Sequence, residues 1–344
     1  MNAEKPLVSI LFCAYNEEAV IEHTLVEVDK FIAERPDYRW EVVVVNDGSK
    51  DRTIELAQAH ASDKENYVVV TYAKNGGLGH ATRKGIEATS GDFVITLDID
   101  LSYSLEHVDW LLAELEATHA QVVLASPYMK GGQLKSVPKV RAFFSIAANR
   151  FLSLFAHGNL STITGMARGY RGEFVRGLYF SSEHMDSLPE MVYKSMVLKG
   201  DIRQIPATLD WTHQLQFQNR RSSMRVLIQI MGTLLSGFMF RPFFFFVLPG
   251  LFLLAFSLYT NVWTVIHAVE AFVAIGQAGG DATISEAIAK AYADYPHTFI
   301  VGLLSLMVAI QLVTLGIVSL QQKQYFDELF RLISFGIKKG SKQV

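Results

Sequence analysis

Two long stretches of this 344-residue chain carry no charged side chain, and they limit the folds that are open to it. The first runs from Pro242 through Val269 and the second from Tyr295 through Gln322. Each exceeds the roughly 20 apolar residues that a helix needs to cross a bilayer. As buried core helices they would need protein on every side, and no chain is left to supply it. The sequence therefore predicts two transmembrane helices within residues 242–322.

The charges that flank these spans are unevenly distributed. Basic residues stand before the first span and after the second, whereas the loop between them is acidic. By the positive-inside rule, residues 1–220, a juxtamembrane helix at 221–241 and a basic tail at 323–344 are cytoplasmic, and the loop is extracytoplasmic. The basic residues are Arg220, Arg221, Arg225, Arg241, Lys323, Arg331, Lys338, Lys339 and Lys342, and the loop carries Glu270, Asp281, Glu286 and Asp294 against Lys290.

The N-terminal part alternates between short apolar runs and segments with helical periodicity. We expect strands at residues 8–13, 41–46, 67–72, 92–98 and 121–126, each separated from the next by a helix. Such alternation implies parallel strands joined by right-handed crossovers. The predicted fold class is therefore α/β, a doubly wound sheet that binds its ligand at the carboxyl ends of the strands.

The fourth predicted strand ends in two acids, Asp98 and Asp100. Residues i and i+2 face the same side of a strand, so both carboxylates can approach one Mg²⁺ or Mn²⁺ that also binds a substrate diphosphate. Asp47 and Asn75 are expected at the same sheet edge. Alone, the signal is weak, because Asp-x-Asp also occurs in turns and helix caps, and Asp47 and Asn75 are common turn residues.

Four ordered motifs in the first hundred residues resemble the family 2 glycosyltransferases with the GT-A fold. They are Ala-Tyr-Asn-Glu-Glu at 14–18, Val-Asn-Asp-Gly-Ser at 45–49, Lys-Asn-Gly-Gly-Leu-Gly at 74–79 and Asp-Ile-Asp at 98–100. The resemblance implies a mixed sheet, a GDP- or UDP-linked sugar donor, and a metal ion at the acidic pair. The donor-binding candidates it implies are Ala14, Tyr15, Glu17, Asp47, Asn75, Gly79, Asp98, Ile99 and Glu190. For Tyr15, Glu17 and Glu190, helix-start chemistry is the alternative.

Apolar residues recur at spacings of four and three from Lys139 to His157, which predicts an amphipathic helix. A separate polar stripe repeats every fourth residue, at Arg141, Ser145, Asn149 and Ser153. Periodicity alone fits an ordinary packed helix with a solvated edge equally well. The phenylalanines and basic residues of the segment also suit a helix that lies in the membrane interface.

In this region the chain is similar to the polyprenyl-phosphate glycosyltransferases, the branch that contains dolichyl-phosphate mannose synthase. The matches are Tyr-Met-Lys-Gly-Gly at 128–132, an Arg-x-x-x-Ser at 141–145 and Gly-Tyr-Arg at 169–171. The resemblance implies that Arg141 and Ser145 bind the phosphate of dolichyl or undecaprenyl phosphate. The acceptor-phosphate candidates are Lys130, Arg141, Ser145 and Asn149.

Four departures from the pattern weaken an assignment to mannose and GDP. Pro127 stands where many members have arginine, Gly165 where an aspartate is common, and Ser102 where mannose synthases carry a glutamine ligand. An Arg-x-x-Gly-x-Ser-Lys segment is degraded at residues 217–223.

A lipid monophosphate is mostly a dianion at neutral pH and needs no strong general base to attack. The catalytic candidates are therefore Asp98 and Asp100, which would hold a metal against the leaving diphosphate, and Arg141, which would hold the attacking phosphate in line. Direct displacement would invert the anomeric centre.

Other classes remain as alternatives. A membrane polysaccharide synthase or a transferase with another acceptor would share the donor motifs, but the Gln-x-x-Arg-Trp typical of the synthases does not occur. An inactive membrane scaffold would be expected to lose the acidic pair, which is present. Two spans are too few for a transporter site. The single cysteine, Cys13, excludes an internal disulfide, no basic stripe indicates nucleic acid, and a homo-oligomer is plausible.

Overall fold

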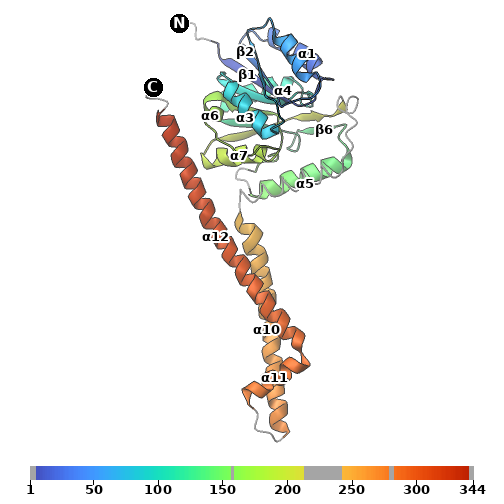
Figure 1. Ribbon diagram of the computed structural model, residues 1–344, viewed down its shortest axis with the longest axis vertical. Coiled ribbons are helices and arrows are strands. Elements are labelled where there is room, and N and C mark those ends of the chain that lie inside the picture. Colours follow the sequence, from blue (N-terminus) through green and yellow to red (C-terminus); the bar gives the residue numbers. More distant parts are fainter. Residues whose placement is uncertain (1–4, 156–158, 213–241, 279–282, 341–344) are drawn as a thin grey trace. The chain divides into compact units, whose positions relative to one another are not determined.

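The computed structural model describes residues 5–155, 159–212, 242–278 and 283–340 (Figure 1). The chain divides into two compact units, one of residues 1–240 with 330–344 and the other of residues 241–329. The predicted juxtamembrane helix at 221–241 and the degraded motif at 217–223 lie outside the described residues, as does His157 at the end of the predicted amphipathic helix.

A seven-stranded sheet in the order β3-β2-β1-β4-β7-β5-β8 forms the centre of the first unit. The five predicted strands are confirmed, and all their mutual pairings are parallel. The strands are β1 (Leu7–Ala14), β2 (Arg39–Asn46), β3 (Tyr67–Thr71), β4 (Phe93–Asp98), β5 (Val122–Ser126), β7 (Arg168–Arg171) and β8 (Ile202–Pro206).

Helices connect these strands and cover the sheet (Figure 1). Because both faces are covered, the central strands are apolar without alternation, and every residue from Val42 to Val45 is buried. Helix α1 buries Ile21, Leu25 and Val28, as its periodicity predicts. The helices of this unit are α1 (Ile21–Ala33), α2 (Thr53–Ala61), α3 (Leu78–Ala88), α4 (Glu106–Thr118), α5 (Lys139–Phe155), α6 (Gly172–Arg176) and α7 (Ser187–Val197).

Strand β7 departs from the purely parallel pairing that the strand–helix alternation predicts. It runs antiparallel between β4 and β5, so the sheet is mixed, as the family resemblance implied. Its four residues include two arginines and a glycine, and the strand therefore lacks the apolar run that marks the others. A Cβ at Gly169 would lie 2.9 Å from a methyl group of Leu115 and 3.1 Å from one of Ile95, so a larger residue would require these side chains to shift.

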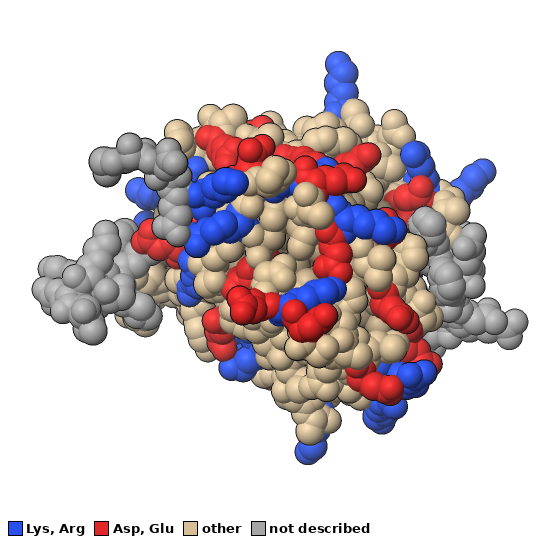
Figure 2. All heavy atoms as spheres, turned by 90° about the horizontal axis from the view of Figure 1, so that it is seen from above, with Lys and Arg blue, Asp and Glu red and all other residues tan. Residues whose placement is uncertain are grey.

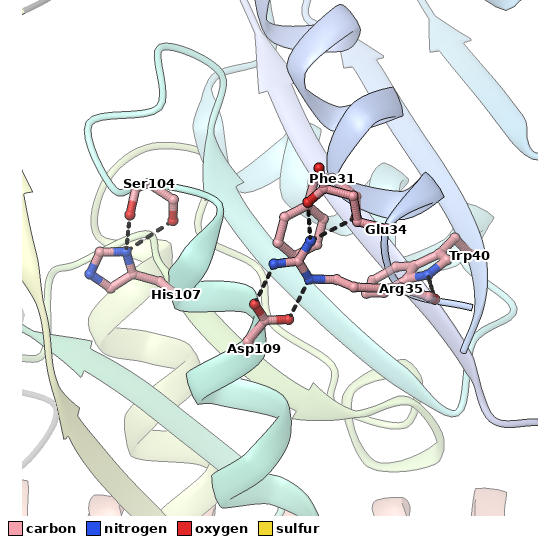
Figure 3. A network of polar contacts seen from close by, with 7 residues as sticks. All are labelled: Phe31, Glu34, Arg35, Trp40, Ser104, His107 and Asp109. Atoms are coloured by element: carbon pink, nitrogen blue, oxygen red, sulfur yellow. Dashed lines mark hydrogen bonds and ion pairs between the residues drawn. The ribbon is translucent and has the colours of Figure 1, made fainter. Parts of the chain in front are cut away.

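Helices α1 and α4 are joined by one polar network (Figure 3). The Arg35 guanidinium donates from Nε and Nη2 to the two carboxylate oxygens of Asp109, both at 2.8 Å, and stacks on the Phe31 ring. His107 on α4 contacts the backbone oxygen of Ser104 through Nδ1 at 2.9 Å and accepts from the Thr208 amide through Nε2 at 3.0 Å. The first turn of α4 therefore holds a segment a hundred residues further along the chain.

That segment is strand β9 (Thr208–Asp210), which pairs in parallel with β6 (Gln133–Lys135). The resulting two-stranded ribbon is separate from the main sheet. Neither strand is expected from the sequence, because three residues with a single leucine each are too few to establish an apolar alternation. On the face of the molecule seen in Figure 2, acidic and basic side chains lie side by side, in keeping with the small net charge of −3.

The second unit is helical. Helices α10 (Pro242–Gln277) and α12 (Pro296–Gly340) are long and apolar enough to cross a membrane, and only 17% of the apolar window of each is buried. Such low burial is unlike that of a core helix, so the two could form a transmembrane hairpin. The predicted tail at 323–344 is a continuation of α12 as far as residue 340. Between them lies α11 (Ile284–Asp294), which begins in a capping box of Thr283 and Glu286.

Small and polar side chains join α10 to α12. Asn261 donates to the carbonyl oxygens of Ser257 and Gly302, at 2.8 and 3.2 Å, and the Ser257 hydroxyl donates to the Gly302 oxygen at 3.0 Å. A Cβ at Gly302 would lie 3.1 Å from the Asn261 side chain, so glycine permits the close approach. Interfaces of this kind are typical of helices that pack in lipid.

Candidate active site

A cavity of about 360 Å³ lies at the carboxyl ends of β1 and β4. One part of its wall comes from the sheet edge and includes Glu17, Asp98 and Asp100. Another comes from α5 and includes Arg141 and Ser145. Side chains that the sequence assigned to the donor and to the acceptor therefore line the same cavity.

The acidic pair lies where β4 leaves the sheet. Leu101 turns the chain with φ of 50°, and the Ser102 amide donates to Asp100 Oδ1 at 3.0 Å. Burial, and then the nearby negative charges of Asp100 and Glu17, raise the pKa of Asp98 to about 7. Two carboxylates therefore lie close together at this strand end, and the protonated form of Asp98 is favoured there. A hard divalent cation with oxygen preference fits this pair.

Among the described residues, no group of three His, Cys, Asp or Glu side chains could hold a metal. Protein ligands for a cation here would be Asp98 and Asp100 alone. Mg²⁺ commonly binds in this way, since one or two carboxylates and the substrate phosphates share its coordination with water.

Asp47 organises the loop before α3. Its carboxylate accepts from the Tyr72 hydroxyl at 2.8 Å, the Asn75 amide at 2.9 Å, and the backbone amides of Gly76 and Gly77 at 2.7 and 3.0 Å. Asp47 is buried and is not among the residues that line the cavity, and neither is Asn75. These contacts are those of a loop-forming residue, whereas a direct contact of Asp47 or Asn75 with the donor remains a prediction.

The loop after β1 lies against the loop after β2. The Glu17 amide donates to Thr53 Oγ1 at 2.8 Å, and Asn16, with φ of 55°, accepts from the Lys50 amide at 2.9 Å. Of the described residues 14–18, only Glu17 lines the cavity. Ile99, which lies between the two acids in the sequence, lines it as well. Ala14 is buried at the end of β1, whereas the Tyr15 side chain is 39% exposed.

Gly79 and Glu190 meet at a third loop, residues 181–184. The Gly79 amide donates to the Glu183 oxygen at 2.7 Å, and a Cβ at Gly79 would collide with the Ser182 oxygen. Burial alone would raise the pKa of Glu190, but Lys194 at 2.6 Å and the amides of Ser181 and Ser182 outweigh it and lower that pKa. Glu190 is thus an ionised buried partner that fixes the loop, and a contact with the sugar remains a prediction.

The four acceptor candidates occupy different positions. The Arg141 guanidinium stacks on the Trp211 ring, and Ser145 Oγ lies 2.6 Å from the Tyr128 hydroxyl. Asn149 is buried; its Oδ1 accepts from the Ile163 amide at 2.7 Å and its Nδ2 donates to Thr164 Oγ1 at 3.0 Å. Asn149 therefore braces the cavity wall from behind. Lys130 is exposed and lies outside the lining.

Several lining residues are not among the sequence candidates. They include Tyr103, Thr164, Met185 and Trp211, each from a different connecting segment. Their types and spacing carry no signal, because they come together only through the sheet topology. Arg168 is also missing from the candidates. It is buried in β7, and its guanidinium donates to the oxygens of Gly165 and Ile163, at 2.7 and 2.6 Å, and so holds the Thr164 segment.

Comparison with known proteins decides the family. Residues 9–178 match the family described as Glycosyl transferase family 2. This part of the chain is a family 2 glycosyltransferase domain. The domain covers the acidic pair, the donor motifs and α5, and so includes most of the cavity described above.

Curated relatives of this domain share limited identity with the chain. A dolichyl-phosphate beta-glucosyltransferase of Trichomonas vaginalis is 23% identical over 58% of this chain and 61% of its own length. A dolichol-phosphate mannosyltransferase of Pyrococcus furiosus is 31% identical over 41% of this chain and 39% of its own. An undecaprenyl-phosphate 4-deoxy-4-formamido-L-arabinose transferase of Shewanella sediminis is 26% identical over 70% of this chain and 69% of its own. The chain thus spans between about two fifths and two thirds of these relatives.

A solved structure supports the fold. Glucosyl-3-phosphoglycerate synthase from Mycobacterium tuberculosis, in complex with Mn²⁺, UDP-glucose and phosphoglyceric acid, superposes with a TM-score of 0.51 at 19% identity. The match covers 67% of this chain and 79% of that one. At this identity the likeness shows the fold alone, which is the GT-A fold.

Proposed function

We propose that this protein transfers a sugar from a nucleotide sugar to a polyprenyl phosphate, with inversion, at the cytoplasmic face of a membrane. One observation carries the proposal: the acidic pair and the Arg141–Ser145 pair line a single cavity. The donor diphosphate and the acceptor phosphate are both anionic, so each needs its own source of positive charge. A bound cation would serve the first and a fixed guanidinium the second.

The positions of the acidic residues in the cavity support an acceptor that is itself negatively charged. The acidic residues that line the cavity are Glu17, Asp98 and Asp100, all on the β1 and β4 side. The described residues that line it from α5 include no carboxylate, and Glu190 is bonded to Lys194 outside the lining. A hydroxyl acceptor would need a general base beside it, whereas a phosphate dianion needs only to be held in position.

Asp98 and Asp100 would hold the divalent cation, Mg²⁺ or Mn²⁺. When bound, it would supply positive charge to the leaving nucleoside diphosphate. Arg141 would hold the attacking phosphate oxygen in line with the anomeric carbon, and Ser145 would donate a further hydrogen bond. Tyr103, which is buried, and the partly buried Cys13 line this end of the cavity and would help to exclude water, and hence hydrolysis of the donor.

The exposed side of α5 supports contact with lipid. Val140, Phe143 and Phe144 are exposed on it, at 70%, 67% and 39%, and basic residues flank them. An amphipathic helix of this composition lies in the interface plane of a bilayer. The names of the curated relatives specify dolichyl and undecaprenyl phosphates and agree with such an acceptor.

The deciding experiment is a transfer assay with purified full-length protein, dolichyl or undecaprenyl phosphate, and a panel of UDP- and GDP-sugars with Mg²⁺ or Mn²⁺. We expect Arg141→Ala to lower transfer by about ten- to a hundredfold, because a charge-assisted contact is worth roughly 1.5 to 3 kcal/mol. Arg141→Lys should recover part of the loss, since lysine keeps the charge but lacks the planar fork.

Arg150→Ala is the matched control, because Arg150 is an exposed arginine of the same helix that lines a different groove. Its transfer rate should stay within about twofold of the parent. A protein that glycosylates soluble sugars as fast as lipid phosphate, or an Arg141→Ala variant with unchanged acceptor kinetics, would place a polysaccharide synthase or another acceptor class ahead of this proposal.

A further inference from the structure

Trp211 contacts Arg141, the arginine that is proposed to bind the acceptor phosphate. The guanidinium carbon of Arg141 is 4.1 Å from the centroid of the indole ring, and both side chains line the cavity. A cation–π contact of this kind is made to the face of the indole and does not use up the N–H donors of the guanidinium, which can still bind other groups. Nothing in the family motifs or in the helical periodicity of α5 points to this tryptophan, which follows β9 about seventy residues later.

Trp211 is itself fixed by the backbone around it. Its amide donates to the Lys135 oxygen at 3.1 Å, which closes the end of the β6–β9 ribbon. The amide of Asp210 donates to the Ser102 oxygen at 2.8 Å, and the amide of Thr208 donates to His107 Nε2 at 3.0 Å. Three successive anchors thus hold the strand that carries the indole.

One of these anchors leads to the acidic pair. Ser102 belongs to the turn after β4, and its own amide donates to Asp100 at 3.0 Å. A continuous path of short contacts therefore runs from Asp100 through Ser102 and Asp210 to Trp211, and from its ring to Arg141. This path places the guanidinium at a set position relative to the carboxylates.

We propose that Trp211 is the positioning residue of the acceptor site: its indole orients Arg141 before the acceptor phosphate binds. The inference rests on the proposed function, because it takes Arg141 as the phosphate ligand. Arginine has a long side chain that loses rotamer freedom when it binds, and a stacked arginine has lost part of that freedom in advance. Without the indole, the part of this ordering cost that the cation–π contact covers falls on acceptor binding.

The expected signature is a change in acceptor KM. We expect Trp211→Leu to raise the KM for dolichyl or undecaprenyl phosphate by about three- to thirtyfold, the range of a cation–π contact, while kcat changes less. Trp211→Phe keeps an aromatic face and should recover part of the loss. The affinity for UDP or GDP with Mn²⁺, measured by calorimetry, should not change, since the indole faces the arginine.

A double-mutant cycle separates positioning from a general structural role. If Trp211 acts through Arg141, Trp211→Leu should have no further effect on acceptor KM in an Arg141→Ala background. Melting temperatures of all variants, and the Trp211→Phe result, show whether the fold is kept.

Two outcomes overturn the inference while the proposed function stands. In the first, Arg141→Ala impairs acceptor binding but folded Trp211→Leu does not. In the second, the two losses add in full, which means that the residues act independently. If Arg141→Ala leaves transfer to polyprenyl phosphate unchanged, the proposed function fails and the inference fails with it.

Discussion

Asp98, the proposed metal ligand, illustrates how a residue retained for binding can lower the stability of the fold. Its carboxyl is partly buried at the end of β4 beside Asp100, and desolvation and the charge of Asp100 raise its pKa to about 7, far above the value near 3.9 of an unfolded chain. Between these two pH values the folded state binds more protons than the unfolded state. The contribution of Asp98 to the free energy of unfolding is therefore fully present below about pH 4 and is lost as the pH rises toward 7 and above.

Asp98→Asn should consequently stabilise the protein at pH 8 when no divalent cation is present, by a few kcal/mol at most. The gain should shrink as the pH is lowered toward 5, because Asp98 of the parent protein is then largely protonated in the folded state. Thermal unfolding in EDTA at both pH values measures the difference, with the exposed-site variant Asp63→Asn as control.

The same variant should lose its response to metal. Millimolar Mn²⁺ should raise the melting temperature of the parent protein at pH 8 and leave that of Asp98→Asn unchanged, because only a folded metal site gains stability from the ion. A variant that is less stable than its parent in EDTA, or one that still responds to Mn²⁺, would argue against a cation at Asp98.

At the scale of elements, the short β6–β9 ribbon depends on a neutral histidine. The Thr208 amide can donate only to an unprotonated Nε2, so the proton of the neutral ring is on Nδ1 and is donated to the Ser104 oxygen. Burial lowers the pKa of His107 below the usual 6.5, although the Ser104 contact and Glu106 oppose the shift. The folded state then binds fewer protons than the unfolded state, so this contribution to stability is lost as the pH falls below 6.5.

His107→Gln offers a test of this contact, because a glutamine can accept from the Thr208 amide but does not titrate. The parent protein should be the more stable of the two at pH 8, and its advantage should narrow or reverse at pH 5.5. Chemical unfolding of both proteins in detergent at the two pH values gives the comparison. An advantage that is constant over this range would mean that His107 is not the titrating group.

Elements with a strong local pattern are those that the sequence predicts. The apolar runs of β1 to β5 and the periodicity of α1 follow from burial on one or both faces, and the structure confirms them. Helix α5 also forms as its periodicity predicts, although Val140 and Phe144 of its apolar stripe are exposed. β7 and β9 are not predicted, since three or four residues held by distant partners leave no periodic signal. The same distinction applies to the site: Asp98, Asp100, Arg141 and Ser145 come from contiguous motifs, whereas Trp211 is brought to the cavity by the ribbon.

At the scale of the whole chain, the two predicted spans make a testable prediction about the side of the membrane on which the first unit lies. The prediction that the glycosyltransferase domain is cytoplasmic rests on the charges flanking α10 and α12, and it can be tested with cysteine labelling. Cys13 can remain in place, because burial raises the pKa of its thiol to about 12 and keeps it from forming the reactive thiolate.

In intact cells, a membrane-impermeant maleimide should label Ser285→Cys on α11, since Ser285 is exposed and belongs to the loop between the spans. The matched variant Ser62→Cys, at an exposed position of the first unit, should react only after the membrane is permeabilised. The opposite labelling pattern would invert the topology, and labelling of both in intact cells would exclude a hairpin.

The antiparallel strand β7 has a consequence for synthesis of the chain. β4 and β5 are neighbours in the sequence but do not pair; residues 168–171 bridge them. While the ribosome is still translating the segment before residue 168, β5 therefore has neither of its strand partners, and the open edge of β4 could pair with another chain. The bridge and β8 are both translated before α10, so the sheet can be completed before this predicted span would enter the bilayer.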